Sequence, residues 1–358
     1  MPLQLLNADQ SRRFDRHLTA VCQAYLAEVD SPLLAERLLT YARQGGKRIR
    51  PQLVLWTYQH CQRSDEAAEP GHLPVAVMDV AAAWELFHAF LLVHDDIIDG
   101  SDSRRGRPSL HRQLQSLDSD SPRFGVNLGI VAGDLFYAWA NRLLADLDLP
   151  GDAYRDLHRL FARVAMLTGL GQAVDVLQSH APIARRDEAT LLREYHWKTA
   201  AYTFEGPMLS AAVLAGLPPD AHAAISGFSL ALGQAYQLQN DLLDVVRPVT
   251  EGSDLAEGKH TLTLLKARQF LDDAARDTFD RDVARIVQGE GRAIALAESV
   301  RQRLLATPAV GETSDRIAEL LDSSLAHAAT LPPRLAGAMA ACVAGLRATY
   351  FRAGIPVA

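Results

Sequence analysis

Residues 75–99 read VAVMDVAAAWELFHAFLLVHDDIID, an apolar segment that ends in three aspartates. Its apolar residues recur at helical spacing, which predicts a long buried α-helix. Asp79, Glu85 and His88 interrupt the apolar run, so we interpret the segment as a core helix and not as a membrane span. The segment therefore favours a helical protein whose polar chemistry begins at the end of a core helix.

Most other segments of the chain also show helical spacing, and no alternating strand pattern or internal repeat is found. Turn signals divide the chain into about ten to twelve helices. We therefore expect an all-α protein, built as one domain over residues 1–358 and organised as a large helix bundle.

Composition and charge narrow the function classes. The chain has 358 residues, of which 48% are hydrophobic, and a net charge of −7. A negative net charge argues against nucleic acid as the partner, since phosphate backbones need a broad basic face. Cys22, Cys61 and Cys342 form no CxxC pair, which indicates neither a zinc site nor a disulfide framework. Together with the absence of a signal-peptide pattern, this predicts a cytoplasmic protein with reduced thiols.

The first acidic motif is HDDIID at residues 94–99. Asp95 and Asp99 are four residues apart, so on a helix their Cβ atoms lie about 5–6 Å from each other on one face. Such carboxylates repel unless a cation lies between them, and carboxylate oxygens suit Mg²⁺. Asp96 points off this face and is expected to support the pair. The alternative is a solvated acidic helix end, which the helix dipole disfavours.

A second motif, QLQNDLLD, occupies residues 237–244. Asn240 and Asp244 repeat the four-residue spacing, with Asp241 beside them, at the end of an apolar helix expected from about Ala224. Two such motifs on separate helices can hold several metal ions and clamp a diphosphate leaving group. Finding both by chance is far less expected than finding either one.

Basic and polar residues accompany the acidic motifs. Arg104 and Arg105 begin RRGRP, and residues 45–51 read GGKRIRP. Arginine forks and lysine charges suit phosphate oxygens, so we expect a second, metal-free anion site on Lys47, Arg50 and Arg105. RRGRP alone would more simply be a solvated basic loop, but both basic stretches accompany two acidic motifs. Other polar residues interrupt apolar patterns, and each alone is more simply structural: Gln172, Asp175, Lys198, Thr199, Gly252, Asp254, Gly258 and Lys259.

The motifs follow one another in a recognisable order: GGKRIRP, HDDIID with RRGRP, GD at 133–134, GQAVD at 171–175, KT at 198–199, YQLQNDLLD at 236–244 and DLAEGKHTL at 254–262. This combination resembles the trans-isoprenyl diphosphate synthases, the family of farnesyl and geranylgeranyl diphosphate synthases. The resemblance implies an isoprenoid synthase-type helix bundle with a central active-site cavity, and usually a homodimer.

The resemblance also implies a role for each matching position. About three Mg²⁺ ions would be held by Asp95, Asp99, Asn240, Asp241 and Asp244. The allylic diphosphate would be contacted by Arg104, Lys198 and Lys259. Isopentenyl diphosphate would be held by Lys47, Arg50, His88 and Arg105. Catalytic groups at the developing cation would be Lys198, Thr199 and Gln237. Supporting residues would be Asp96, Gln172, Asp175 and Asp254.

The sequence departs from the family pattern at two places. Asn240 stands where the family usually has aspartate, so the second motif has one negative charge fewer. The loop after Asp244 is short, and Thr250 stands near the place of an expected lysine, which puts one diphosphate contact in doubt.

Phe90 and Leu91, one turn before Asp95, are the expected determinants of product length. A bulky ring at Phe90 would close the floor of the hydrocarbon pocket, because a packed interior admits no further prenyl unit. The resemblance therefore implies mainly a C20 product, with C15 as the alternative. A class I terpene cyclase would need neither GGKRIRP nor RRGRP. A non-catalytic partner subunit would tend to lose its acidic motifs.

Overall fold

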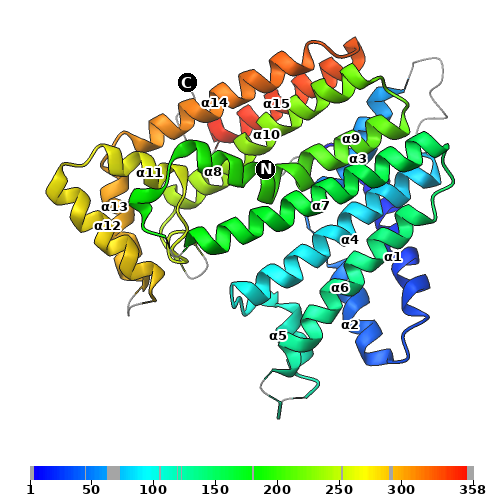
Figure 1. Ribbon diagram of the computed structural model, residues 1–358, viewed down its shortest axis with the longest axis horizontal. Helices are drawn as coiled ribbons and strands as arrows, with labels where there is room; N and C mark the ends of the chain where they lie inside the picture. The colour runs from blue at the N-terminus through cyan, green and yellow to red at the C-terminus, as the bar shows by residue number, and fades with distance from the viewer. Residues whose placement is uncertain are drawn as a thin grey trace. The chain divides into compact units, whose positions relative to one another are not determined.

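The computed structural model describes residues 4–44, 46–62, 73–104, 106–118, 120–121, 123–179, 181–250, 253–289 and 293–352. This part of the chain forms helices α1 to α15, a short 3₁₀ turn, a π-helical segment η2 and one two-stranded ribbon (Figure 1). The all-α prediction is confirmed. More helices form than the expected ten to twelve, in part because α8, η2 and α9 follow one another with no turn signal between them.

The chain folds into two compact units. The first, here the N-terminal unit, is Pro2–His158 with Ser210–Gly216, and the C-terminal unit is Arg159–Leu209 with Leu217–Ala358. The single-domain assignment stays a prediction.

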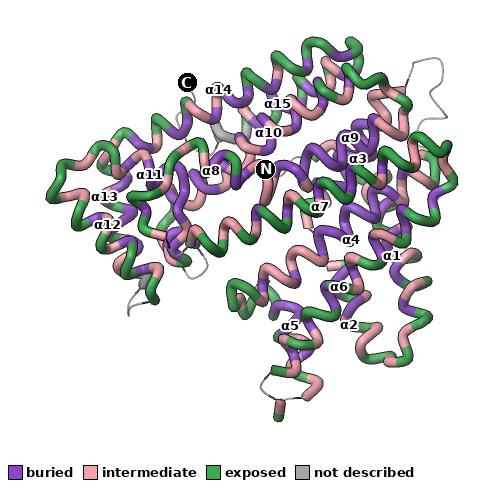
Figure 2. The backbone as a smooth tube through the Cα atoms, in the orientation of Figure 1, coloured by how far each residue is buried: buried purple, intermediate pink, exposed green. Residues whose placement is uncertain are grey.

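The N-terminal unit is built around α4. Its elements are α1 (Ala8–Leu26), α2 (Pro32–Arg43), α3 (Ile49–Cys61), α4 (Val75–Ile98), β1 (Ser103–Arg104), β2 (Arg107–Pro108), α5 (Leu110–Gln115), α6 (Phe124–Ala145), the start of α7 (Gly151–Ser179) and the end of α9 (Gly206–Leu214). Helix α4 starts at Val75, as expected, and packs against α3 and α6. Much of α4 is buried (Figure 2). Trp84 and Phe87 are among its buried residues, and burial of such large side chains stabilises the unit.

Glycines let α6 lie very close to α4. A Cβ atom at Gly133 would lie 2.4 Å from the His94 ring, and one at Gly129 would lie 2.9 Å from Ile97 Cδ1. Both contacts are shorter than side chains allow, so a larger residue at either position would force the His94 ring or the Ile97 side chain to move. The close approach therefore falls at the end of α4 that carries the aspartates.

The C-terminal unit is built around α10. Its elements are the rest of α7, η1 (Ile183–Arg185), α8 (Glu188–Tyr195), η2 (His196–Glu205), the start of α9, α10 (Pro219–Val246), α11 (Leu262–Gln269), α12 (Asp273–Val287), α13 (Ala293–Leu305), α14 (Ala309–Ala328) and α15 (Pro333–Arg352). Helix α10 packs along α14 and against η2. It starts at Pro219, earlier than the expected Ala224, since proline is favoured in the first turn of a helix.

The segment η2 fits between α7 and α10 at two glycines. A Cβ atom at Gly171 would lie 2.5 Å from the backbone nitrogen of Lys198, and one at Gly233 would lie 2.4 Å from Ala200 Cβ. Single π-helical insertions are frequent at functional sites. Here the insertion carries Lys198 and Thr199.

Two helices, α4 and the segment Gly151–Gln178 of α7, have the length and composition of membrane spans. Core helices of soluble proteins share both properties, and 56% of the most apolar window of α4 is buried inside the protein. The absence of a membrane span stays a prediction.

Candidate active site

The first acidic motif ends α4 with three aspartates in different surroundings. Asp95 is half-buried in the last turn, Asp96 is fully buried, and Asp99 is exposed at the C-cap, where its backbone N–H donates to Asp95 O at 2.8 Å. The carboxylates of Asp95 and Asp99 are thus the more accessible ones, and Asp96 lies inside the protein.

Arg104 connects the ribbon to this motif. Its Nε donates to Asp96 Oδ1 at 2.5 Å, and its Nη2 donates to Asp95 Oδ2 at 3.4 Å. Burial lowers the pKa of Arg104, but the charge and hydrogen bond of Asp96 outweigh it and raise the pKa above its ordinary value. Asp96 therefore holds a guanidinium beside Asp95, where it can contact an anion bound to the motif.

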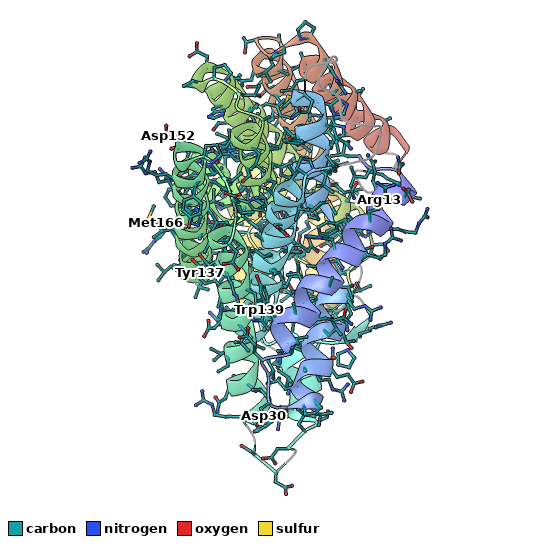
Figure 3. All side chains as sticks on the ribbon, turned by 90° about the vertical axis from the view of Figure 1, so that its right-hand side faces the viewer. Arg13, Asp30, Tyr137, Trp139, Asp152 and Met166 are labelled. Atoms are coloured by element: carbon teal, nitrogen blue, oxygen red, sulfur yellow. The ribbon has the colours of Figure 1, made fainter. Side chains whose placement is uncertain are left out.

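Phe90 belongs to an aromatic cluster between α4 and α6. Its ring centroid lies 4.7 Å from that of His94, 5.2 Å from that of Tyr137 and 5.7 Å from that of Phe87. Figure 3 labels Tyr137 on α6. Phe90 and its neighbour Leu91 are half-buried. Contacts of this kind fix the orientation of a ring beyond what area burial alone provides.

The residues expected to hold isopentenyl diphosphate differ in how far they are buried. Arg50 and His88 are buried, and Lys47 is exposed. His88 and Arg104 line one partly open pocket, together with Arg48 and Glu85.

Arg48 and Glu85 are not among the site residues predicted from the sequence. Lys47 and Arg50 do not line this cavity. Arg105, Gly45 and Gly252 lie outside the described residues.

In the second motif, Asp241 is buried and Asn240 is half-buried. The Tyr195 hydroxyl donates to Asp241 Oδ2, and Gln237 Nε2 donates to Asp241 Oδ1 at 2.7 Å. Burial, followed by the nearby charge of Asp254, raises the pKa of Asp241 to about 7. Tyr195 was not predicted from the sequence, because its partner Asp241 lies 46 residues away along the chain.

Asp244 and Lys259 extend this cluster. The backbone N–H of Asp254 donates to Asp244 Oδ2 at 2.8 Å, and Lys259 Nζ donates to Asp254 Oδ1 at 3.1 Å and lies 2.7 Å from Glu257 Oε2. Burial and the charge of Asp254 raise the pKa of Asp244. The structure thus gathers Asp241, Asp244 and Asp254 around one lysine, although their motifs are separated in sequence.

Lys198 projects from η2 to α7, where its Nζ donates to Asp175. Glu194 lies next in this chain of contacts: it interacts with Asp175, and its Oε2 lies 3.1 Å from Arg186 Nη1. Gln172 and Thr199 are half-buried nearby in sequence. Lys198 and Asp175 were each selected from the sequence, and the structure shows that they are in contact. Glu194 and Arg186 were not selected, and only the fold brings them to this cluster.

Within the part of the chain that the structure describes, no group of three or more His, Cys, Asp or Glu side chains is arranged to hold a metal ion by itself. The chemistry of the donors nevertheless fits Mg²⁺, since both motifs offer carboxylate or amide oxygens. The pKa of Asp241 and that of Asp244 are raised partly by a like charge, which a divalent cation would offset. Such donors suit an ion that shares its coordination shell with a phosphate ligand.

A helical fold with two acidic motifs, with Arg104 beside the first and Lys259 beside the second, is suited to metal-assisted chemistry on diphosphates. A sequence profile of the family described as polyprenyl synthetase matches residues 31–295. The chain belongs to this family and is a prenyltransferase of the isoprenyl diphosphate synthase type.

Individual relatives agree with the family. The short chain isoprenyl diphosphate synthase of Methanocaldococcus jannaschii is 30% identical over 258 residues, which is 70% of this chain and 70% of that protein. The geranylfarnesyl diphosphate synthase of Natronomonas pharaonis is 29% identical over 313 residues, or 75% of this chain and 87% of that protein.

A solved structure is also similar. The geranylgeranyl pyrophosphate synthase of Corynebacterium glutamicum, complexed with isoprenyl diphosphate and magnesium, has a TM-score of 0.80 and 28% identity. The match covers 94% of this chain and 98% of that one. The names of these relatives differ in product length, so membership of the family leaves product length open.

Proposed function

We propose that the protein condenses isopentenyl diphosphate head-to-tail with dimethylallyl, geranyl and farnesyl diphosphates and releases mainly geranylgeranyl diphosphate, a C20 product. The observation that carries this proposal is Phe90, a large ring one turn before Asp95 that is held by Tyr137 and His94. A held ring supports a closed floor for the hydrocarbon pocket. The similar enzyme of Corynebacterium glutamicum is named for geranylgeranyl pyrophosphate, a C20 compound, which supports the same product length.

The proposed reaction begins when the allylic C–O bond breaks and the electron pair leaves with the diphosphate. Arg104, Lys198 and Lys259 stabilise the growing charge on the leaving group. When bound, Mg²⁺ neutralises further charge there, and its protein ligands would come from Asp95, Asp99, Asn240, Asp241 and Asp244. About three ions per site are expected.

The carbon skeleton is then extended. The isopentenyl double bond attacks the allylic carbon, a carbon–carbon bond forms, and a proton is lost to the released diphosphate. Thr199 and Gln237 present oxygen atoms to the developing cation. Lys47, Arg50, His88 and Arg105 bind isopentenyl diphosphate, so that the two substrates react from fixed positions.

The supporting residues are assigned by their contacts. Asp96 holds Arg104, Asp175 holds Lys198, and Asp254 holds Lys259. Gln172 is assigned to the same supporting group because it belongs to the GQAVD motif. We also propose that the enzyme acts in the cytoplasm as a homodimer of single-domain chains.

One experiment tests the function. The pure protein is incubated with isopentenyl diphosphate, Mg²⁺ and one allylic primer at a time, and the dephosphorylated products are separated by chromatography. We expect a C20 alcohol as the main product from every primer. A C15 main product would favour the farnesyl diphosphate alternative, and cyclised hydrocarbons or no product would contradict the proposal.

A further inference from the structure

The turn that leads into α3 has an uncommon backbone conformation. Arg48 has φ 46° and ψ 40°, and it is the only non-glycine residue with positive φ among those that the structure describes. A side chain with a Cβ atom rarely adopts this left-handed conformation, because Cβ crowds the following carbonyl oxygen. The turn therefore persists only if surrounding contacts hold it. Arg48 lies directly between Lys47 and the first turn of α3, which carries Arg50.

The side chain of Arg48 is anchored inside the N-terminal unit. Its Nη1 donates to Glu85 Oε1 at 2.6 Å, its Nη2 donates to Ala42 O at 3.1 Å, and its Nε lies 3.3 Å from Asp15 Oδ1. The side chains of Arg48 and Glu85 are 13% and 8% exposed, whereas that of Asp15 is 56% exposed. Glu85 is therefore the buried partner and Asp15 the peripheral one.

Glu85 and Arg48 depend on each other. The second carboxylate oxygen of Glu85, Oε2, is buried and has no hydrogen-bond partner within the described part of the chain. A buried carboxylate is strongly unfavourable without its cation. Burial lowers the pKa of Arg48, and the charge and hydrogen bond of Glu85 more than offset this and raise it.

A second contact holds the backbone at the peptide that joins Lys47 to Arg48. Gln52 Nε2 donates to Lys47 O at 2.6 Å, and Gln52 Oε1 accepts from the backbone N–H of Leu5 at 2.8 Å. Glu85 also lies three residues before His88 on α4, so the two side chains are neighbours on that helix. The ion pair thus connects the turn to a third residue of the expected isopentenyl diphosphate site.

We propose that Arg48 and Glu85 are positioning residues for the diphosphate of isopentenyl diphosphate. Their buried ion pair fixes the left-handed turn that sets the directions of Lys47 and Arg50. The inference rests on the proposed function and deepens it, because it names residues that set the affinity for one of the two substrates. Neither residue needs to touch the ligand, since both act through the backbone of the turn.

The test compares Glu85→Gln with Asp15→Asn, which removes the charge of the peripheral partner of the same guanidinium. For Glu85→Gln we expect the KM for isopentenyl diphosphate to rise about tenfold or more, because small displacements of binding groups have large effects. The KM for the allylic primer and kcat should stay within about twofold, as for an interaction made with one substrate only. Asp15→Asn should leave all three constants near those of the wild type.

A double variant separates positioning from stability. In Arg48→Met/Glu85→Leu both charges are absent, so the protein should unfold near the wild-type temperature, but the KM for isopentenyl diphosphate should stay raised. If the double variant regains the wild-type KM, or if both KM values rise in proportion to lost stability, the pair only stabilises the fold.

A further outcome would also overturn the inference. If Arg48→Met raises this KM and Glu85→Gln does not, Arg48 binds the ligand directly. A wild-type protein that forms no isopentenyl-dependent product would instead contradict the proposed function itself.

Discussion

At the scale of single residues, Phe90 tests the proposed product length. Replacing Phe90 with Ala removes a half-buried ring that contacts Tyr137 and His94, which opens space beyond the C20 tail. We expect products longer by one or more prenyl units, measured by chromatography of the dephosphorylated alcohols. Phe270→Ala, the same change at an exposed position, should leave the products unchanged. An unaltered product from Phe90→Ala would contradict the assignment.

Substitution of Asn240 tests whether the second motif binds Mg²⁺ more weakly because it has one carboxylate fewer. Asn240→Asp adds a carboxylate beside Asp244, and carboxylates bind Mg²⁺ more tightly than amides do. We expect the Mg²⁺ concentration for half-maximal activity to fall about three- to tenfold. Titration of activity with Mg²⁺ measures this concentration. A higher Mg²⁺ requirement in the variant would show that Asn240 is not a ligand.

Individual site residues could be predicted from the sequence more readily than the contacts between them. Lys198 and Asp175 stood out because charged side chains interrupted apolar helices, and they do meet. Tyr195 and Glu85 could not be selected, because their partners lie far away in sequence and only tertiary packing brings them together. Arg48 belongs to the GGKRIRP motif, but its left-handed backbone conformation could not be predicted, since no local sequence signal requires that conformation in arginine.

At the scale of elements, the contact between α7 and η2 depends on Gly171. In Gly171→Ala the new Cβ atom would meet the backbone of Lys198, so η2 must shift. We expect a loss of about 1–3 kcal/mol in unfolding free energy and a lower kcat, because Lys198 moves. Gly169→Ala is the matched control on the same helix, with nothing within 4 Å of its Cβ atom. If both variants lost the same stability and kcat, the close contact between Gly171 and the backbone of η2 would be contradicted.

Glu205 connects three helices and predicts a pH dependence. It accepts from Arg163 on α7 and from Ser226 on α10 and lies 3.6 Å from His196 Nε2. Burial raises its pKa, but the polar contact with His196, the hydrogen bond of Ser226 and the charge of Arg163 outweigh it and lower the pKa from 4.5 to about 2.

Since the pKa of Glu205 is lower in the folded state, its contribution to stability is complete above pH 4.5. It is lost as the pH falls toward about 2, and it amounts to about 3 kcal/mol. Glu205→Gln should therefore unfold more easily than the wild type at pH 7, and this difference should narrow below pH 4.5. Denaturant unfolding of both proteins at several pH values measures the difference. A difference independent of pH would contradict the role of the charge.

Long elements could be predicted, and short ones could not. The start of α4 at Val75 follows from a sustained apolar pattern after a proline. The π-helical turns of η2 have no comparable signal, because α8, η2 and α9 follow one another directly, with no turn between them. The ribbon of β1 and β2 was also missed, since strands of two residues are too short for an alternating pattern.

At the scale of the whole molecule, the proposed homodimer has a direct test. Exposed apolar side chains occur on α6 at Val131 and on α7 at Met166, which points outward in Figure 3. Such residues are typical of interfaces when they gather in patches. Light scattering should give twice the 39.1 kDa of one chain.

Substitution at the exposed face tests the same proposal. Val131→Lys should shift the measured mass toward that of one chain, because a charge in an apolar interface is unfavourable. Leu33→Lys, a change at an exposed leucine of α2, should not alter the mass. A wild-type mass of one chain would contradict the homodimer.

The class of fold was predictable from the whole chain, because helical spacing and the order of motifs extend over most of its length. The division into two compact units was not. Each unit is assembled from separate stretches of sequence, and packing between distant stretches leaves no periodic trace in the sequence. The helices can therefore be predicted from the sequence, whereas their grouping into units is seen only in the structure.

The contact between Phe90 and Tyr137 has a consequence for how this enzyme can diverge. The ring proposed to limit product length is held from α6, a helix that carries neither acidic motif. A change at Tyr137 can let Phe90 turn aside while both acidic motifs stay intact. A lineage can therefore shift from one isoprenoid product to another through a substitution on a neighbouring helix, and gene duplicates can acquire new products without an inactive intermediate.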